Sequence, residues 1–122
     1  MALLHKEITE RIIEACYEVA NELGAGFLES VYEKALLVAL SEKGIDVASQ
    51  VPMAVSFRKQ NVGEFFADII VESKVVVEVK AVKRLIPEHS AQVINYLKAT
   101  GIEVGLLVNF GGPKVEIKRL HG

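Results

Sequence analysis

The segment Val75–Leu85, VVVEVKAVKRL, decides how the chain is interpreted, because a run of β-branched residues contains two charges. Such a run predicts a buried strand over 75–82. Side chains alternate between the two faces of a strand, so Glu78 and Lys80 share one face while Val77 and its neighbours take the other. Either this face is wet and the charges form a surface ion pair worth about 0–1 kcal/mol, or the charges have a chemical task.

The composition limits the second alternative. With 122 residues, 51% of them apolar and 25% charged, the chain fits one globular domain spanning 1–122. A net charge of -2 gives no general attraction to nucleic acid, so any such binding must be local. The single cysteine, Cys16, falls on the apolar stripe of an expected helix and is interpreted as a buried thiol.

No stretch of the chain approaches the roughly 18 uninterrupted apolar residues of a membrane span. We therefore expect a cytoplasmic protein without a membrane partner. The sequence leaves the oligomeric state open, and a homodimer is compatible with it.

Periodicity and turn residues predict the element order ααβββαββ. A mixed central sheet flanked by helices follows, which is an α/β (α+β) fold. Pro87 should open the third helix and Gly101 should close it, while Lys59-Gln60-Asn61 should form the turn between the first two strands. The expected helices span about 4–23, 28–43 and 88–100, and the expected strands span 51–58, 64–72, 75–82, 103–109 and 114–120.

A third charged group, Asp68, interrupts the apolar strand that precedes Glu78. A two-residue turn at Ser73-Lys74 would place Asp68 opposite Val79 and send the two acids to opposite faces of the sheet. We therefore predict a connecting loop with an odd number of residues, most simply three, or a β-bulge.

Two carboxylates and a lysine that converge in this way can perform metal-assisted hydrolysis. Carboxylates bind Mg²⁺ through oxygen and leave positions for water and phosphate, and Mn²⁺ is the alternative ion. The ammonium of Lys80 can then orient the attacking water and neutralise charge on the phosphate.

The pattern Asp68, a gap, then Glu78-Val79-Lys80 resembles the PD-(D/E)XK nuclease superfamily, and in particular its GxxExxY branch. Ala67 stands where the superfamily name has proline, and Ala25 where many branch members have proline; neither change removes a reactive group. The blocks that resemble the branch are Gly26–Tyr32, Glu78–Ala81, His89–Leu97 and Gly105–Gly111.

The resemblance implies a restriction-endonuclease-like core and a Mg²⁺-dependent nuclease that acts on nucleic acid, with DNA as the expected substrate. It also implies that Glu29 joins Asp68 and Glu78 as a metal ligand. The alternative is that Glu29 only stabilises the first turn of its helix through the helix dipole, which is worth about 0.3–1 kcal/mol.

By the same resemblance, Gln92 would be a catalytic residue and Tyr96 would contact substrate from the same helix face. An ordinary half-exposed helix face remains the alternative for both. His89 could contact phosphate or merely lie at the helix end. Lys83 and Arg84 could supply a local positive field for substrate or simply be solvated.

Two functions therefore remain open. One is a metal-dependent phosphodiesterase in which Asp68 and Glu78 bind the ion and Lys80 lies beside the nucleophile. The other is a catalytically silent nuclease-fold module that binds nucleic acid or assembles with protein.

Overall fold

The computed structural model describes residues 3–122, and its elements follow the predicted order ααβββαββ. None of the described helices combines the length and apolarity that crossing a membrane requires. Pro87 begins the third helix, and Gly101 ends it in a left-handed conformation (φ 75°), as predicted. The elements are α1 (Lys6–Leu23), α2 (Glu29–Glu42), β1 (Val47–Phe57), β2 (Gln60–Val71), β3 (Val75–Lys80), α3 (Pro87–Thr100), β4 (Val104–Asn109) and β5 (Glu116–His121).

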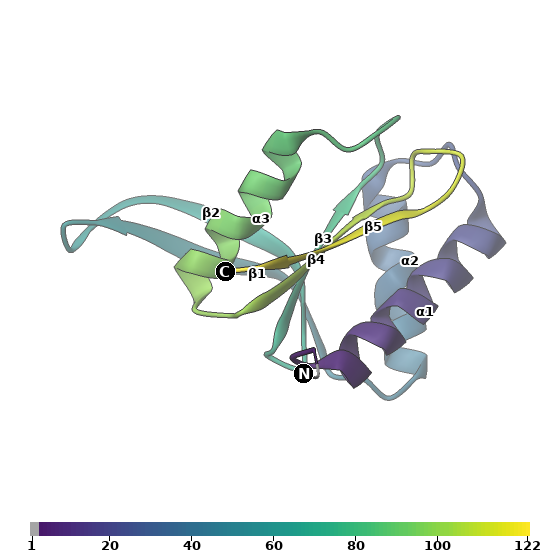
Figure 1. Ribbon diagram of the computed structural model, residues 1–122, viewed down its shortest axis with the longest axis horizontal. Helices are drawn as coiled ribbons and strands as arrows, with labels where there is room; N and C mark the ends of the chain where they lie inside the picture. The colour runs from purple at the N-terminus through teal and green to yellow at the C-terminus, as the bar shows by residue number, and fades with distance from the viewer. Residues whose placement is uncertain (1–2) are drawn as a thin grey trace.

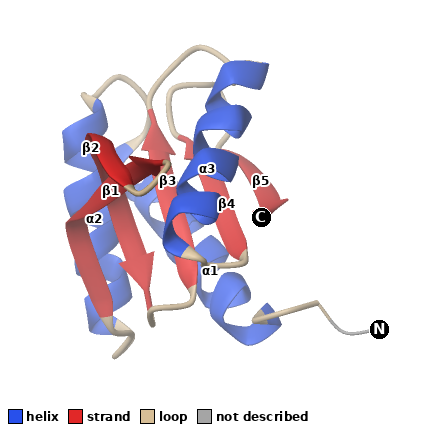
Figure 2. Ribbon diagram, turned by 90° about the vertical axis from the view of Figure 1, so that its left-hand side faces the viewer, coloured by secondary structure: helices blue, strands red, loops and turns tan. Residues whose placement is uncertain are grey.

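The five strands form one mixed sheet in the order β1-β2-β3-β4-β5. Strands β3 and β4 are parallel and are joined across the sheet by α3, whereas the other neighbouring pairs are antiparallel. Helix α3 covers one face of the sheet, and α1 and α2 cover the other (Figure 2). The predicted mixed sheet between helices is confirmed.

The two faces of the sheet bury different cores. Val75, Val77 and Val79 of β3 pack against α1 and α2 in the larger core, whereas Val76 packs under α3 in the smaller one. Gly105 lets α3 approach closely, because a Cβ atom at this position would lie 2.7 Å from Cγ1 of Val93. The charges on β3 therefore lie on the face that α3 covers.

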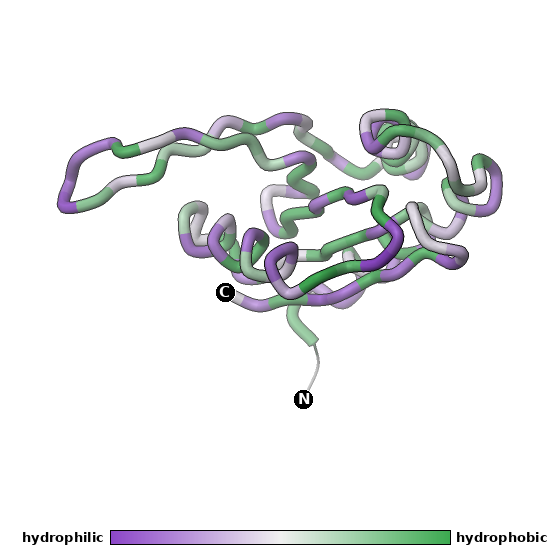
Figure 3. The backbone as a smooth tube through the Cα atoms, turned by 90° about the horizontal axis from the view of Figure 1, so that it is seen from above, coloured by the Kyte–Doolittle hydropathy of each residue, from purple (hydrophilic) through white to green (hydrophobic). Residues whose placement is uncertain are grey.

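Strands β1 and β2 form a long hairpin that projects beyond the rest of the sheet (Figure 1). The hairpin is longer than predicted, and the predicted Lys59–Asn61 turn is wrong. The turn is the pair Arg58-Lys59, with φ values of 49° and 66°, and it joins Phe57 directly to Gln60. Figure 3 shows that the tip is hydrophilic, so no apolar alternation marks these residues as strand.

The loop between β2 and β3 has three residues, Glu72, Ser73 and Lys74, because Val71 pairs with Val75. The predicted odd-numbered loop is confirmed. Glu72 and Ser73 adopt positive φ values of 53° and 56°, and the Lys74 N–H donates to the Val71 carbonyl at 2.9 Å.

Candidate active site

The three-residue loop brings Asp68 and Glu78 together. Regular pairing between β2 and β3 ends at Ile69 and Val77, and the next step of the same register places Asp68 opposite Glu78. Here side chains replace the backbone ladder. The Asp68 N–H donates to Glu78 Oε1 at 3.3 Å, and the Val79 N–H donates to Asp68 Oδ2 at 2.9 Å. Both carboxyl groups are thus held in place by backbone groups of the opposite strand.

Glu78 is only 4% exposed, although it is an acid. Burial, and then the negative charge of Asp68, raise the pKa of Glu78 to about 8, against the opposing effect of the Lys80 ammonium. Without a bound cation, burial and the neighbouring acid therefore favour the protonated form of the Glu78 carboxyl. This face of β3 is not a wet strand surface.

Lys80 is held toward the acids by α3. Its Nζ donates to Oε1 of Gln92 at 3.0 Å, which fixes the long side chain against the helix. Gln92 is therefore the hydrogen-bond partner of Lys80, a contact that could not be identified from the sequence. Among the hydrogen bonds of residues 3–122, Gln92 is the only side chain that accepts from this ammonium.

The start of α2 brings further acids to the same region. Glu29 is exposed as a residue, but partial desolvation of its carboxyl raises its pKa. The Lys80 ammonium lowers this pKa and the Asp68 carboxylate raises it, so both groups act on Glu29 electrostatically. Glu33, one helical turn later, accepts from Nε2 of Gln50 at 2.7 Å, and the same amide lies 3.4 Å from Oδ1 of Asp68.

The sequence analysis missed Glu33 and Gln50. A signal for Glu33 existed, because it follows Glu29 by four residues and therefore shares its helix face. No sequence signal identified Gln50. This residue lies within β1 and has a left-handed backbone conformation, with φ of 50°, which no strand pattern predicts.

The GxxExxY block has a structural explanation. Tyr32 is fully buried; its hydroxyl donates to the Gly24 carbonyl at 2.6 Å and accepts from the Phe27 N–H at 3.2 Å. Its ring stacks on Phe110 at 4.8 Å between centroids. The tyrosine thereby fixes the loop immediately before Glu29.

Tyr96 lies near the acids, whereas the other predicted substrate contacts lie at the start of α3 and in the loop before it. Tyr96 stacks on Phe65 at 4.2 Å, and burial raises its pKa to about 12, with Glu78 and Asp68 adding to the rise. Nδ1 of His89 accepts from the Ile86 N–H at 3.1 Å, so this ring caps α3. Lys83 and Arg84 are exposed in the loop between β3 and α3.

Asn109, at the end of β4, positions that loop and was also missed. It is fully buried, exchanges two hydrogen bonds of 2.9 Å with the backbone of Val82, and donates to Oε1 of Glu116. These bonds end β3 at Lys80 and not at the predicted residue 82. Gly111 permits the contact, since a Cβ atom there would lie 2.4 Å from the Val82 backbone.

The donor set of this site fits a hard divalent cation. Asp68 and Glu78 offer carboxylate oxygens, and no ion pair within residues 3–122 involves either of them. Among the same residues, no group of three His, Cys, Asp or Glu side chains is placed to hold a metal ion, and Glu29 as a third ligand stays a prediction. The pair that is assembled would suit Mg²⁺ completed by water and phosphate.

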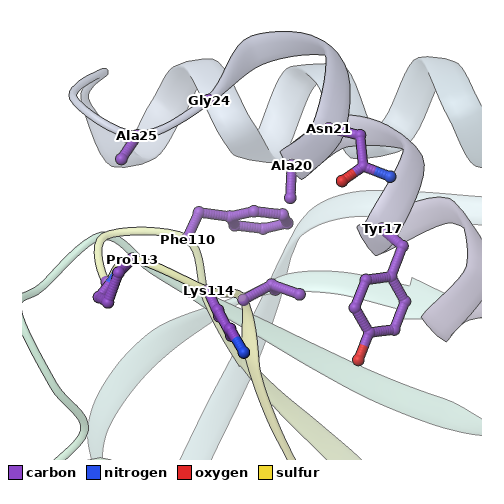
Figure 4. Close-up of a pocket in the computed structure, with 10 residues that line it drawn as sticks. Tyr17, Ala20, Asn21, Gly24, Ala25, Phe110, Pro113 and Lys114 are labelled. Atoms are coloured by element: carbon purple, nitrogen blue, oxygen red, sulfur yellow. The ribbon is translucent and has the colours of Figure 1, made fainter.

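A separate pocket of about 270 Å³ lies between the end of α1 and the loop after β4 (Figure 4). Tyr17, Asn21, Phe110 and Lys114 are among its lining residues. It contains none of the acids described above, and we assign it no part in the site.

Comparison with solved structures finds the same fold in the crystal structure of SSO0001, with a TM-score of 0.60 and 18% sequence identity. The alignment covers 94% of this chain but 57% of that one, so the chain spans little more than half of its length. Comparison with curated proteins found no match.

The family comparison is more informative. The model of the PD-(D/E)XK nuclease superfamily matches residues 6–120, a range that includes Asp68, Glu78 and Lys80. Together with the mixed sheet and its flanking helices, this match confirms the restriction-endonuclease-like core; membership of the narrower GxxExxY branch stays a prediction. The chain belongs to the PD-(D/E)XK nuclease superfamily.

Proposed function

We propose that this chain is a metal-dependent nuclease that hydrolyses phosphodiester bonds of DNA. The observation that carries the proposal is the cross-strand pair of Asp68 and Glu78 beside Lys80. Burial of Glu78 next to a second acid is unfavourable for two charges, and a divalent cation would reverse that penalty. Such pairs are concentrated at sites that do chemistry.

Each side chain has a distinct task in this proposal. Asp68 and Glu78 would hold Mg²⁺ or Mn²⁺, which supplies a Lewis acid for the phosphate and an acidified water. Lys80, oriented by its hydrogen bond to Gln92, would bring its ammonium to the negative charge that develops on the phosphate. Lys83 and Arg84, exposed in the following loop, would attract the DNA backbone.

The experiment compares wild type with Glu78→Gln, which keeps the shape of the side chain and removes its charge. For wild type, Mg²⁺ or Mn²⁺ at ten times its Kd should raise the melting temperature by about 5 °C, because the ion binds only the folded site. Linear and branched DNA should be cut only when the ion is present. Glu78→Gln should lose both responses while its metal-free stability is unchanged or higher.

Glu103→Gln is the matched control, since Glu103 is exposed and lies before β4, outside the site. It should behave as wild type in both assays. If wild type and Glu78→Gln respond identically to the ion, the carboxyl pair is not a metal site, and a non-catalytic module of the same fold replaces the nuclease.

A further inference from the structure

A groove of about 750 Å³ lies between the β1–β2 hairpin and α3. This volume falls within the range of roughly 300–1,000 Å³ that is typical of ligand-binding pockets. The hairpin projects beside α3, so one wall of the groove is strand and the other is helix (Figures 1 and 3). The lining includes Val55 and Phe65 from the hairpin and Gln92, Asn95, Tyr96 and Lys98 from α3.

The groove is continuous with the candidate active site. Gln92 lines the groove and also accepts the hydrogen bond from Lys80 Nζ at 3.0 Å. Tyr96 lines the groove as well, and it is close enough to Glu78 for that charge to affect its pKa. A molecule that has one group at the acids can therefore extend along α3 into this space.

The lining has the chemistry of a nucleotide site. The half-buried Phe65 ring provides flat apolar surface, and it is fixed by stacking on the buried Tyr96 ring at 4.2 Å between centroids. The amides of Gln92 and Asn95 offer both donors and acceptors, which match the edges of bases. Lys98 supplies a cation for a phosphate, so apolar, amide and cationic groups all line one groove.

The charge of the hairpin tip extends the same match. Arg58 and Lys59 form the turn, and the guanidinium of Arg58 lies 4.9 Å from the centre of the Phe57 ring. The tip is thus a second cationic point, beyond Lys98, that could contact the same backbone. Because the net charge of the chain is -2, attraction to a nucleic-acid backbone depends on such local cations.

We propose that this groove binds unpaired nucleotides of the DNA strand that is cut, next to the scissile phosphate. The inference rests on the proposed function and adds its substrate class: DNA with a single-stranded segment or end. A duplex keeps base faces inside its stack, where they cannot contact the Phe65 ring, whereas an unpaired strand exposes them.

The test measures binding of a fluorescent single-stranded DNA of about 12 nucleotides and of the matching blunt duplex, by anisotropy in EDTA. Val55→Glu places a negative charge in the groove at a partly exposed position. The double variant Asn95→Ala/Lys98→Ala removes polar contacts from two exposed positions of α3. Lys74→Ala is the control, because it removes an exposed charge from the β2–β3 loop.

Wild type should bind the single strand more tightly than the duplex, and both groove variants should weaken single-strand binding about tenfold. Lys74→Ala should bind as wild type, and thermal melts should show that all variants fold. Equal binding by the groove variants and Lys74→Ala, or tighter binding of the duplex, would overturn the proposal.

Cleavage of the same DNA with Mn²⁺ separates the two proposals. If the groove variants weaken binding but no DNA is cut, the groove proposal is supported and the nuclease proposal is overturned. If DNA is cut but the groove variants bind as tightly as wild type, the nuclease proposal is supported and the groove proposal is overturned.

Discussion

The two faces of β3 are buried to the same extent and yet are built from different chemistry. Val77 is 0% exposed under α1 and α2, and Glu78, the next residue, is 4% exposed under α3. Neighbours of Val77 are hydrocarbon, whereas Glu78 faces Asp68, Lys80 and Tyr96. Burial alone therefore does not distinguish a core from a site; the distinction lies in what surrounds the buried group.

The charged face costs stability that the apolar face does not. Well-packed hydrocarbon in place of buried charges is often neutral or stabilising by about 1–4 kcal/mol. The chain nevertheless has Asp68 and Glu78 at positions where valines would pair across the strands. Hydrocarbon side chains would avoid this cost, and the cost is the physical ground for assigning the face a chemical task.

The largest expected effect comes from placing an acid on the wrong face. Val77→Asp buries a carboxylate among the apolar side chains that pack between β3 and helices α1 and α2. We expect a loss of more than about 4 kcal/mol of unfolding free energy, which leaves little or no folded protein. Urea denaturation followed by circular dichroism measures it.

Val38→Asp is the matched control for that change, because Val38 on α2 is 59% exposed. Its effect should stay within about 0.5 kcal/mol. A Val77→Asp protein as stable as Val38→Asp would show that the two faces of β3 tolerate charge equally, and the contrast between them would then carry no functional meaning.

The next effect is the pH dependence of the metal-free protein. The raised pKa of Glu78, about 8, means that the folded state binds a proton more tightly than the unfolded chain does. The resulting stability is fully present below the unfolded pKa of 4.5 and is lost as pH rises through about 8. The loss is on the order of a few kcal/mol, at about 1.4 kcal/mol per pKa unit.

Urea denaturation in EDTA between pH 5 and 9 tests this expectation. Wild type should lose stability with rising pH relative to Glu78→Gln, which lacks the titrating group, so that the variant is the more stable protein at pH 9. The facing groups that also titrate or carry charge, Asp68, Lys80, Tyr96 and Glu29, are present in both proteins. Parallel pH profiles for the two proteins would contradict the assignment of the effect to Glu78.

The register of the site could be predicted from the sequence because it depends on parity alone. Strand alternation requires an odd loop if Asp68 and Glu78 are to share a face, and the loop has three residues. The β1–β2 hairpin could not be predicted in full. The residues missed, 47–50 of β1 and 60–63 of β2, show no apolar alternation, and Arg58-Lys59 lacks the Asn-Gly signal of such turns.

The contacts around the acids were unpredictable for a different reason. Gln50 reaches Glu33 and Asp68 only because its backbone adopts a left-handed conformation within a strand. Asn109 lies in a recognised sequence block, but its role depends on how closely Gly111 approaches Val82. Such roles arise from tertiary distances that neither spacing nor composition encodes.

The smallest expected effect tests a polar link between the larger core and the loop before Glu29. Tyr32→Phe keeps the ring that stacks on Phe110 but removes the hydroxyl that bonds Gly24 and Phe27. Loss of these bonds should cost about 1–2 kcal/mol of unfolding free energy and loosen the loop before Glu29. Tyr17→Phe, at a tyrosine that is 50% exposed, should change stability by less than about 0.5 kcal/mol.

Hydrogen exchange locates the effect of Tyr32→Phe, because faster exchange should be confined to the loop at 24–28 and the first turn of α2, while β3 amides keep their protection. If Tyr32→Phe exchanges as wild type does in this loop, the hydroxyl does not position Glu29. If protection falls across β3 as well, Tyr32 serves the whole apolar core and is not a specific link to the site.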